Sequence, residues 1–389
     1  MGVLCHDRAK PNLPFGNYRV IDFTLSNCIH SGIGEIAALV DYQRSSVARY
    51  LRQWTQANSS EQQMPIILEP KAGSYKGTAD AVAQNTDFIA RHPGDEVLLL
   101  AADHVYKMDY RKMIAFHEAM NADATVGVVP VPLSEAHHFG VVKVDGDGRI
   151  TEFVEKPADP PSRLASMGIY VFKKEILLQR LAEDSRDRDS VHDFGHVIMP
   201  GMVSRDRVCA YMFDDFWRDI GNVDTYYQSN IELIYNPAPF SLNGEWPIMT
   251  TNMNLAPPSV TGGGKIINSL VSPGCVIKGT VENSVLSTGV RVEEDARITN
   301  SVVMANSFIG EHTLIDRSII DEQVSIGKYC LVGYGAAMPD ENEITVIGKG
   351  VTVPNRTAIG RRCLVLPNVK AIDFTTSAVR PGAVIAGGA

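Results

Sequence analysis

The sequence predicts two folded parts: an α/β domain with a Rossmann-like, doubly wound and mostly parallel sheet, and after it a parallel β-helix. Short apolar segments alternate with helical patterns over residues 1 to about 235, which is typical of a sheet with helices on both faces. A 17-residue repeat follows, as in solenoid proteins. The 389 residues suffice for two domains, each with its own core.

The amino-acid composition argues against several classes of function for this chain. The net charge is −9 without a densely basic stretch, so we expect no nucleic-acid polymer as partner. The six cysteines form no CxxC pair, which favours free thiols in a reducing compartment. No apolar run reaches the roughly 18 residues that span a bilayer, and no signal peptide is evident. We therefore expect a cytoplasmic protein that is not in a membrane.

The first part of the chain, residues 1–235, carries the α/β pattern. Apolar segments too short for helices predict strands, and the stretches between them with helical periodicity predict helices. The expected strands are 36–40, 66–68, 97–101, 125–131, 141–144, 150–153 and 168–172, and the expected helices are 45–54, 78–91, 110–119 and 174–183.

Residues 236–264 are rich in Pro, Gly and Asn and predict an extended linker. The repeat follows within 265–389, where Ser284, Ser301 and Ser318 recur every 17 residues. Aliphatic residues fall at every sixth position of each unit: Leu286, Val292, Ile298, Val303, Ile309, Ile315, Ile320, Ile326 and Val332. Three inward positions per turn predict a three-sided β-helix, which resembles the left-handed hexapeptide-repeat type. We expect a weaker coil at 269–283 and another at 344–369.

Asp103 is the most informative candidate site residue. It follows the apolar run 97–100, which we interpret as a strand buried on both faces. Ligands of open α/β sheets bind at the carboxyl ends of strands, and a carboxylate there suits a divalent cation beside phosphate oxygens. The alternative is a turn or helix N-cap aspartate.

Other short motifs carry weaker signals. Gly77 permits close backbone approach, and Thr78 opens a helix whose first N–H groups suit ligand oxygens; the alternative is an ordinary N-cap. Lys156 in FVEKP is a charge suited to a phosphate, or else a solvated loop lysine. Asp219 in WRDIG is a second carboxylate, or else one half of a surface pair with Arg218.

The order of these motifs resembles that in bacterial ADP-glucose pyrophosphorylases, within the sugar-1-phosphate nucleotidyltransferase family. The motifs are RAKPNLPFGNYRVIDFTLSNC (8–28), YKGTADAV (75–82), AADHVYKMDY (101–110), FGVVKV (139–144), FVEKP (153–157), ASMGIYVF (165–172), HDFG (192–195) and WRDIG (217–221). The resemblance covers nearly the whole chain. It implies transfer of an adenylyl group from ATP to α-D-glucose 1-phosphate, giving ADP-glucose and pyrophosphate for glycogen or α-glucan synthesis.

The resemblance also implies roles for individual residues. Asp103, Lys156 and Asp219 would be catalytic, with the two aspartates holding Mg²⁺. The sugar phosphate would contact Gly140, Glu155, Lys156 and Ser166. The nucleotide would lie near Lys10, Tyr75, Gly77, Thr78 and Asp80. Arg8 and Arg19 match basic residues of an effector site, and the family suggests a homotetramer.

One part of the family pattern has no counterpart. The family carries a strand and a glycine-rich GGxGTRL loop just before RAKP, whereas this chain begins MGVLCHDRAKP. That loop supplies backbone N–H groups to the triphosphate. We expect that the sequence opens at the end of the loop, that its N-terminal domain is less stable, and that catalysis by residues 1–389 is weak.

Three alternatives remain open on sequence grounds. The chain could use UTP, dTTP or GTP, because base choice lies in loops. It could be a catalytically silent regulatory subunit of the same family, although such subunits usually lose metal carboxylates. It could be a hexapeptide acyltransferase with His312 as catalytic histidine, although His312 reads as a solvated corner residue.

Overall fold

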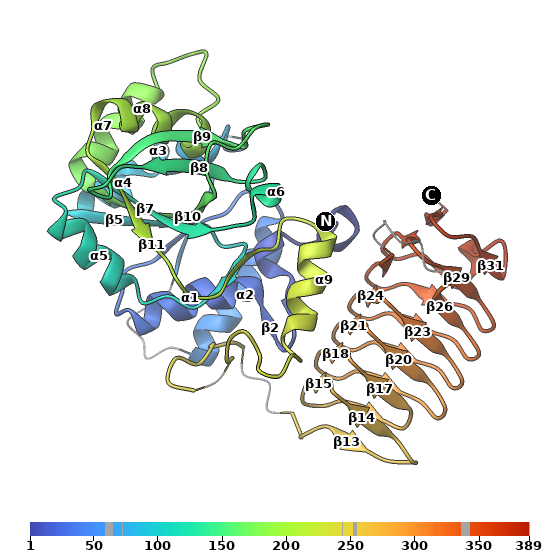
Figure 1. The fold of residues 1–389 in the computed structure, drawn as a ribbon. Coiled ribbons are helices and arrows are strands. Elements are labelled where there is room, and N and C mark those ends of the chain that lie inside the picture. Colours follow the sequence, from blue (N-terminus) through green and yellow to red (C-terminus); the bar gives the residue numbers. More distant parts are fainter. Residues whose placement is uncertain (59–64, 72, 243, 252–254, 336–342, 389) are drawn as a thin grey trace.

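The computed structural model describes residues 1–58, 65–71, 73–242, 244–251, 255–335 and 343–388. An α/β domain stands beside a β-helix (Figure 1). The helices are α1 (Val20–His30), α2 (Arg44–Asn58), α3 (Thr78–Ala83), α4 (Thr86–Arg91), α5 (Tyr110–Ala119), α6 (Leu133–Ala136), α7 (Lys174–Asp184), α8 (Met199–Arg205) and α9 (Val223–Glu232). Shorter helical turns are Gly2–Cys5, Lys10–Asn12, Phe194–Ile198 and Ala371–Asp373.

The strands of the first domain form one large sheet and several two-stranded pairs. They are β1 (Pro14–Phe15), β2 (Tyr18–Arg19), β3 (Ala37–Leu39), β4 (Ile66–Leu68), β5 (Glu96–Leu100), β6 (His104–Tyr106), β7 (Ala124–Pro130), β8 (Gly140–Val144), β9 (Ile150–Glu155), β10 (Leu164–Lys173), β11 (Val208–Met212) and β12 (Trp217–Asp219). The predicted α/β class is confirmed.

The sheet is mixed, which corrects the expectation of a mostly parallel one. The central strand β10 runs antiparallel to β5, β7 and β8, and β8 runs antiparallel to β9, whereas β11 is parallel to β7. The reason lies in the connections. Strands β8 and β9 are joined by a tight turn rather than a crossover helix, and a tight turn forces antiparallel pairing.

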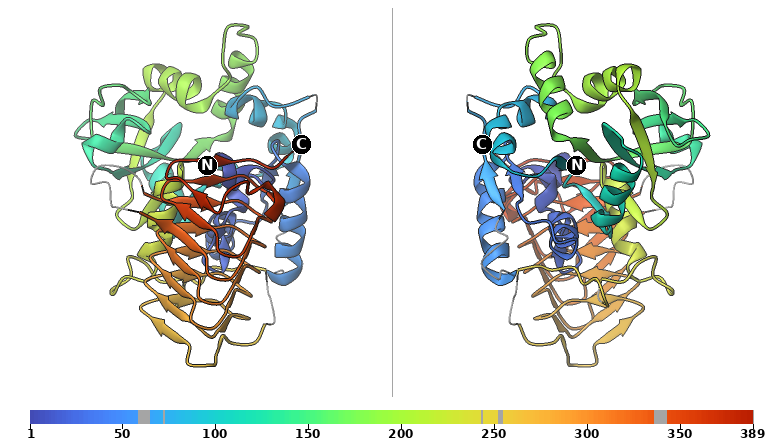
Figure 2. Two further views of the ribbon diagram at one scale, coloured as in Figure 1. Left: turned by 90° about the vertical axis from the view of Figure 1, so that its right-hand side faces the viewer. Right: turned by 90° about the vertical axis from the view of Figure 1, so that its left-hand side faces the viewer.

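Two layers of helices cover this sheet, as Figures 1 and 2 show. Alternate residues of β10 face opposite cores: Phe172 packs with side chains of α3, α7 and α8, while Val171 packs with side chains of α1 and α5. Strand β5 pairs only with β10 and β3 only with β4 among the described residues. Residues 97–100 are accordingly half-buried rather than fully buried, because one edge of β5 has no described neighbour.

The second domain is a three-sided parallel β-helix, as predicted. One side holds β13 (Ser259–Val260), β16 (Val276–Ile277), β19 (Arg291–Val292), β22 (Phe308–Ile309), β25 (Ser325–Ile326) and β28 (Thr352–Val353). The second holds β14 (Lys265–Ile267), β17 (Thr280–Glu282), β20 (Arg297–Thr299), β23 (Leu314–Asp316), β26 (Leu331–Tyr334), β29 (Ala358–Gly360) and β31 (Ala378–Val379). The third holds β15 (Leu270–Val271), β18 (Val285–Leu286), β21 (Val302–Val303), β24 (Ser318–Ile320), β27 (Thr345–Ile347), β30 (Leu364–Val365) and β32 (Val384–Ile385).

The predicted inward positions form the axis of the β-helix. All nine aliphatic residues of the repeat belong to one buried cluster, each at most 2% exposed. The two additional coils expected at 269–283 and 344–369 are both present. The serines that mark the repeat also stack, since Ser301 N donates to Ser284 Oγ and Ser318 N donates to Ser301 Oγ. Each coil therefore fixes the register of the next.

The segment 236–264 is packed rather than freely extended in the parts that the structure describes. Trp54 Nε1 donates to Met249 O and Trp246 Nε1 donates to Asn27 Oδ1, which fastens the segment to α1 and α2. Ile248 is buried. The first coil strand, β13, lies within the range that composition assigns to the linker, and residues 243 and 252–254 lie outside the described residues.

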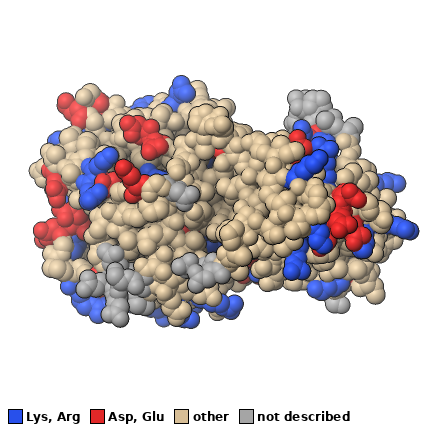
Figure 3. Space-filling view, turned by 90° about the horizontal axis from the view of Figure 1, so that it is seen from below, with Lys and Arg blue, Asp and Glu red and all other residues tan. Residues whose placement is uncertain are grey.

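The two domains share an apolar core, so they form one unit. Leu4, Phe15 and Phe23 of the first domain pack with Val302 and Ile319 of the β-helix. The N-terminal residues lie between the domains (Figures 1 and 2). On the face seen in Figure 3, charged residues gather toward the outer ends of both domains and are sparse where the domains meet. Each large apolar side chain buried in this shared core contributes about 1.5–3 kcal/mol to the stability of the fold.

Candidate active site

The structure brings Asp103 and Asp219 together around one imidazole. Asp103 follows β5, and His104 opens β6, which pairs antiparallel with β12 and places Asp219 opposite His104. His104 Nε2 lies 3.6 Å from Asp103 Oδ1 and 3.7 Å from Asp219 Oδ1. Ile220 N also donates to Asp103 O at 3.4 Å. The helix N-cap in this region is Asp109, not Asp103, so the N-cap alternative is wrong.

Nearby positive charges compensate only part of the negative charge of Asp103 and Asp219. Burial and the neighbouring charge of Asp103 raise the pKa of Asp219, while His104, Lys10 and Lys156 oppose that rise. Lys10 Nζ lies 3.8 Å from Asp103 Oδ2. Both carboxylates keep some solvent contact, with side chains 33% and 25% exposed respectively. A cation that reaches this pair would relieve their repulsion.

Strand β10 changes partner beside this carboxylate pair. Its register shifts between Ser166 and Tyr170, and Gly168 at the shift has a φ of +65°. A Cβ on Gly168 would lie 3.2 Å from Ala101 Cβ and 3.5 Å from His104 Cε1. Glycine suits this position because the left-handed conformation disfavours a side chain and a Cβ would crowd Ala101. The bulge turns buried Ser166 toward Tyr170, whose OH lies 3.3 Å from Ser166 Oγ.

Glu155 and Lys156 lie at the end of β9. Lys156 has a φ of +46° and its N donates to Phe139 O at 3.0 Å, so the chain turns sharply at this residue. Lys156 Nζ lies 3.6 Å from Glu155 Oε1, and its side chain is 61% exposed. Glu155 Oε2 would lie 2.7 Å from a Cβ on Gly140, and a Cβ on Gly195 would also collide with this carboxylate. Because Gly140 and Gly195 have no side chains, there is room between them for the Glu155 carboxylate.

Tyr75, Gly77, Thr78 and Asp80 lie in one segment, the nucleotide loop (residues 75–80), which runs into the first turn of α3, whereas Lys10 lies beside Asp103. Thr78 Oγ1 donates to Asp193 Oδ2 at 2.9 Å and accepts from Phe194 N at 2.9 Å. The N-cap of α3 is Gly77, so the ordinary N-cap alternative for Thr78 is wrong. Asp80 Oδ2 accepts from Lys76 N at 2.8 Å, which tightens the same turn.

Tyr75 stands at the entrance to that loop. Its backbone N donates to Asp41 Oδ2 at 3.1 Å, and Asn85 Nδ2 donates to Tyr75 OH at 3.2 Å. These bonds fasten the loop to the segment after β3 and to the junction between α3 and α4, where Asn85 is the N-cap of α4.

Arg8 and Arg19 lie at the domain interface rather than in this site. Arg8 is 2% exposed and pairs with Asp321 and Glu322 of the β-helix, and Arg19 Nη2 lies 2.7 Å from Glu322 Oε1. Lys349 Nζ adds a contact of 3.0 Å to Asp7. Both arginines have partners within the protein, and they connect the two domains.

Sequence reasoning missed two contributors to the site. His104 separates the two aspartates, and its ring lies edge-on to Trp217 at 5.1 Å between centroids. Asp193 binds Thr78. The position of His104 directly after Asp103 could have marked it as a site residue. The contact between His104 and Asp219, however, depends on pairing between segments more than 100 residues apart. Arg218 pairs with Glu232 at 3.3 Å, so a local Arg218–Asp219 pair is not what holds Asp219.

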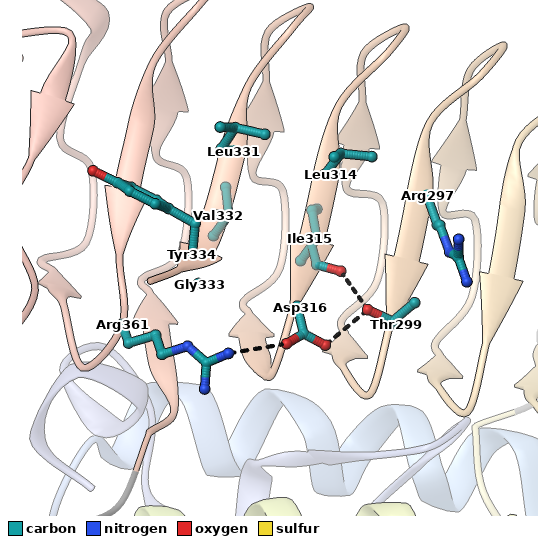
Figure 4. A pocket seen from close by; sticks show the side chains of 10 residues that line it. All are labelled: Arg297, Thr299, Leu314, Ile315, Asp316, Leu331, Val332, Gly333, Tyr334 and Arg361. Carbon is teal, nitrogen blue, oxygen red and sulfur yellow. Dashed lines mark hydrogen bonds and ion pairs between the residues drawn. The ribbon is translucent and has the colours of Figure 1, made fainter. Parts of the chain in front are cut away.

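A separate concavity lies on the β-helix, between β20 and β29 (Figure 4). Its volume is about 360 Å³. Its charges already have partners: Arg361 lies 3.7 Å from Asp316, and Arg297 lies 2.7 Å from Glu282. His312, the acyltransferase candidate, has a φ of +57° and stacks on Tyr329. It is a partly exposed corner residue, as expected.

Comparisons with known proteins agree with both domains. Residues 3–235 match the nucleotidyl transferase family, and residues 258–362 match the GlmU-like C-terminal hexapeptide family. A glucose-1-phosphate adenylyltransferase of Acetivibrio thermocellus is 39% identical over 96% of this chain and 92% of its own length. That of Thermomicrobium roseum is 40% identical over 100% and 94% respectively. Glucose-1-phosphate adenylyltransferase 2 of Alkalilimnicola ehrlichii is 41% identical over 86% and 84%.

Proposed function

The chain belongs to the nucleotidyl transferase family, among the glucose-1-phosphate adenylyltransferases, and we propose that it makes ADP-glucose and pyrophosphate from ATP and α-D-glucose 1-phosphate. The observation that carries this proposal is the convergence of Asp103 and Asp219 on one edge of the sheet, 3.6 and 3.7 Å from His104. Glycogen or α-glucan synthesis is the use that such a product serves.

The residues on the sugar side of the site have separate roles in the transfer. Lys156, exposed at the turn after β9, binds the phosphate of glucose 1-phosphate. Glu155, Ser166 and the backbone at Gly140 orient the sugar, so that its phosphate oxygen approaches the α-phosphorus of ATP. Orientation of two substrates in this way replaces a bimolecular encounter by a positioned one.

ATP lies across the nucleotide loop. Gly77, Thr78, Asp80 and Tyr75 form this loop, whereas the first N–H groups of α3 are already used, because Ala79 N and Asp80 N donate to His192 O. Lys10, 3.8 Å from Asp103, supplies positive charge to the phosphates.

Mg²⁺ fits the carboxylate pair. No group of three or more His, Cys, Asp or Glu residues that suits a metal occurs in the described residues. Mg²⁺ is commonly held by one or two carboxylates together with substrate phosphates, which is what Asp103 and Asp219 offer. The ion would neutralise charge on the transferring group and on pyrophosphate. His104 lies 3.6 Å and 3.7 Å from the two carboxylates that would hold the ion.

Nucleotide preference is the test of this function. The natural full-length protein is assayed with glucose 1-phosphate, Mg²⁺ and, in parallel, ATP, UTP, dTTP and GTP. We expect the largest kcat/KM with ATP. A preference for UTP or dTTP would overturn the ADP-glucose assignment and favour the related nucleotidyltransferases.

A catalytically silent regulatory role is less well supported. Such a subunit has no need of the metal and phosphate groups, whereas Asp103, Asp219 and Lys156 are all present and lie in one region. Absence of turnover from the full-length protein, together with co-purification of an active homologue, would favour that role.

Assembly and location complete the proposal. We infer a homotetramer that uses both the β-helix and the catalytic domain, acting in the cytoplasm. No helix in the described residues is long and apolar enough to cross a membrane. Sedimentation velocity of the full-length protein tests the assembly, and a trimer, a state that hexapeptide domains often adopt, would contradict it.

A further inference from the structure

A buried polar cluster lies behind the nucleotide loop. It consists of Asp184 at the end of α7, Ser190 and His192. Asp184 Oδ2 accepts from His192 Nδ1 at 2.8 Å, while Asp184 Oδ1 accepts from Ser190 Oγ. His192 N in turn donates to Ser190 Oγ at 3.0 Å. Asp184 and His192 are only 6% and 8% exposed, so this cluster is sheltered from solvent.

The backbone of His192 is held in an unusual conformation by this cluster. His192 has a φ of +52°, a left-handed conformation that a residue with a side chain adopts only at a cost. The conformation aims the His192 carbonyl at α3, where it accepts from Ala79 N at 2.8 Å and from Asp80 N at 3.3 Å. Helix α3 therefore starts against the His192 carbonyl. A Cβ on Gly77 would collide with that carbonyl, so Gly77 lies directly against it.

The residues after His192 extend the connection toward the sugar side. Asp193 accepts from Thr78 Oγ1, and Gly195 lies against Glu155. One loop, residues 190–195, thus contacts the nucleotide loop and the proposed sugar-binding carboxylate. Any movement of His192 would shift both.

We propose that Asp184 and His192 are a positioning pair, which holds Gly77 and the first turn of α3, the end of the nucleotide loop, in the geometry that ATP binding and transfer need. The inference rests on the proposed function, because it assumes that this loop receives the nucleotide. Neither residue contacts a substrate. Buried polar groups that lose a partner are destabilised, so removal of the carboxylate releases the imidazole and the strained backbone that it holds.

The test compares three variants of the natural full-length protein. Asp184→Ala removes the partner of His192. Asp184→Asn keeps the shape and one acceptor oxygen for His192 Nδ1, while its NH2 group can donate to Ser190 Oγ instead of accepting from it. His117→Ala is the matched control, because His117 is also buried and bonded to one side chain, Thr125, at 2.8 Å. It belongs to α5, whose side chains pack on the opposite face of the sheet from α3.

We expect Asp184→Ala to lower kcat/KM for ATP on the order of 10²-fold, as misplaced substrate-positioning groups do. Asp184→Asn should recover most of that loss. His117→Ala should lower the Tm by a comparable amount and leave kcat/KM unchanged. Equal kinetic constants for Asp184→Ala and His117→Ala would overturn the positioning role and leave only a structural one.

Hydrogen exchange without substrates separates this inference from the proposed function. The Ala79 and Asp80 amides should exchange faster in Asp184→Ala than in wild type and return toward wild type in Asp184→Asn. Unchanged exchange at these amides overturns the inference even if ADP-glucose is made. A wild-type protein that makes no ADP-glucose overturns the proposed function and, with it, the kinetic role. If Asp184→Ala does not fold, Ser190→Ala is used, with the same direction expected and unchanged kcat/KM and exchange contradicting it.

Discussion

Replacement of Asp103 by Asn keeps the shape of the side chain and removes one charge from the carboxylate pair. A unit charge acting on another charge about 4 Å away contributes ~4 kcal/mol in partly exposed surroundings, and Asp103 is 33% exposed. If the charge acts mainly in the transition state, kcat falls by on the order of 10³-fold. Substrate KM values should change much less.

The measurement is steady-state formation of pyrophosphate by the full-length enzyme. Asp147→Asn is the matched control, since it makes the same substitution at an exposed turn between β8 and β9. The control should keep wild-type kcat. An Asp103→Asn enzyme with near-normal kcat would remove Asp103 from the mechanism.

Four further predictions follow from particular contacts. Lys156→Ala should raise the KM for glucose 1-phosphate by on the order of 10²-fold with little change for ATP; a change confined to ATP would contradict its role. The pKa of Asp219 is raised in the folded protein, so its ionisation lowers stability as pH rises above the ordinary aspartate pKa. Asp219→Asn should therefore raise the Tm at neutral pH but not at acid pH, while abolishing turnover; calorimetry at both pH values tests this. Arg8→Ala should cost about 3–5 kcal/mol in urea unfolding, because buried Asp321 loses its cationic partner and Glu322 keeps only Arg19 and Lys349; a smaller loss would contradict the interface role. His312→Ala should leave turnover intact, and a loss of activity would revive the acyltransferase alternative.

Local patterns predicted the parts of the fold that local physics determines. The β-helix follows from spacing alone, because each coil contacts only its neighbours. Asp103 was placed correctly after β5, because an apolar run and its end are visible in the sequence. The expected helix 78–91 is broken into α3 and α4. Asn85 Nδ2 donates to Ala81 O, and such side-chain bonds compete with helical ones.

Nonlocal contacts account for what the sequence did not reveal. Helix α1 was missed because it is buried on nearly every side and shows no amphipathic period. The strand directions depend on the paths of the connecting segments, and hydrophobic periodicity does not predict these paths. The contact between His104 and Asp219 requires β6 and β12 to pair, and the bulge at Gly168 is visible only once the two neighbours of that part of β10 are known.

The most direct test of the central claim is ³¹P NMR of the full-length protein with ATP, glucose 1-phosphate and Mg²⁺. If the carboxylate pair supports adenylyl transfer, the resonances of ATP and glucose 1-phosphate decline together while ADP-glucose and pyrophosphate appear in equal amounts. Asp219→Asn should halt all four changes. Release of inorganic phosphate without a sugar nucleotide, or consumption of ATP with glucose 1-phosphate untouched, would contradict the account.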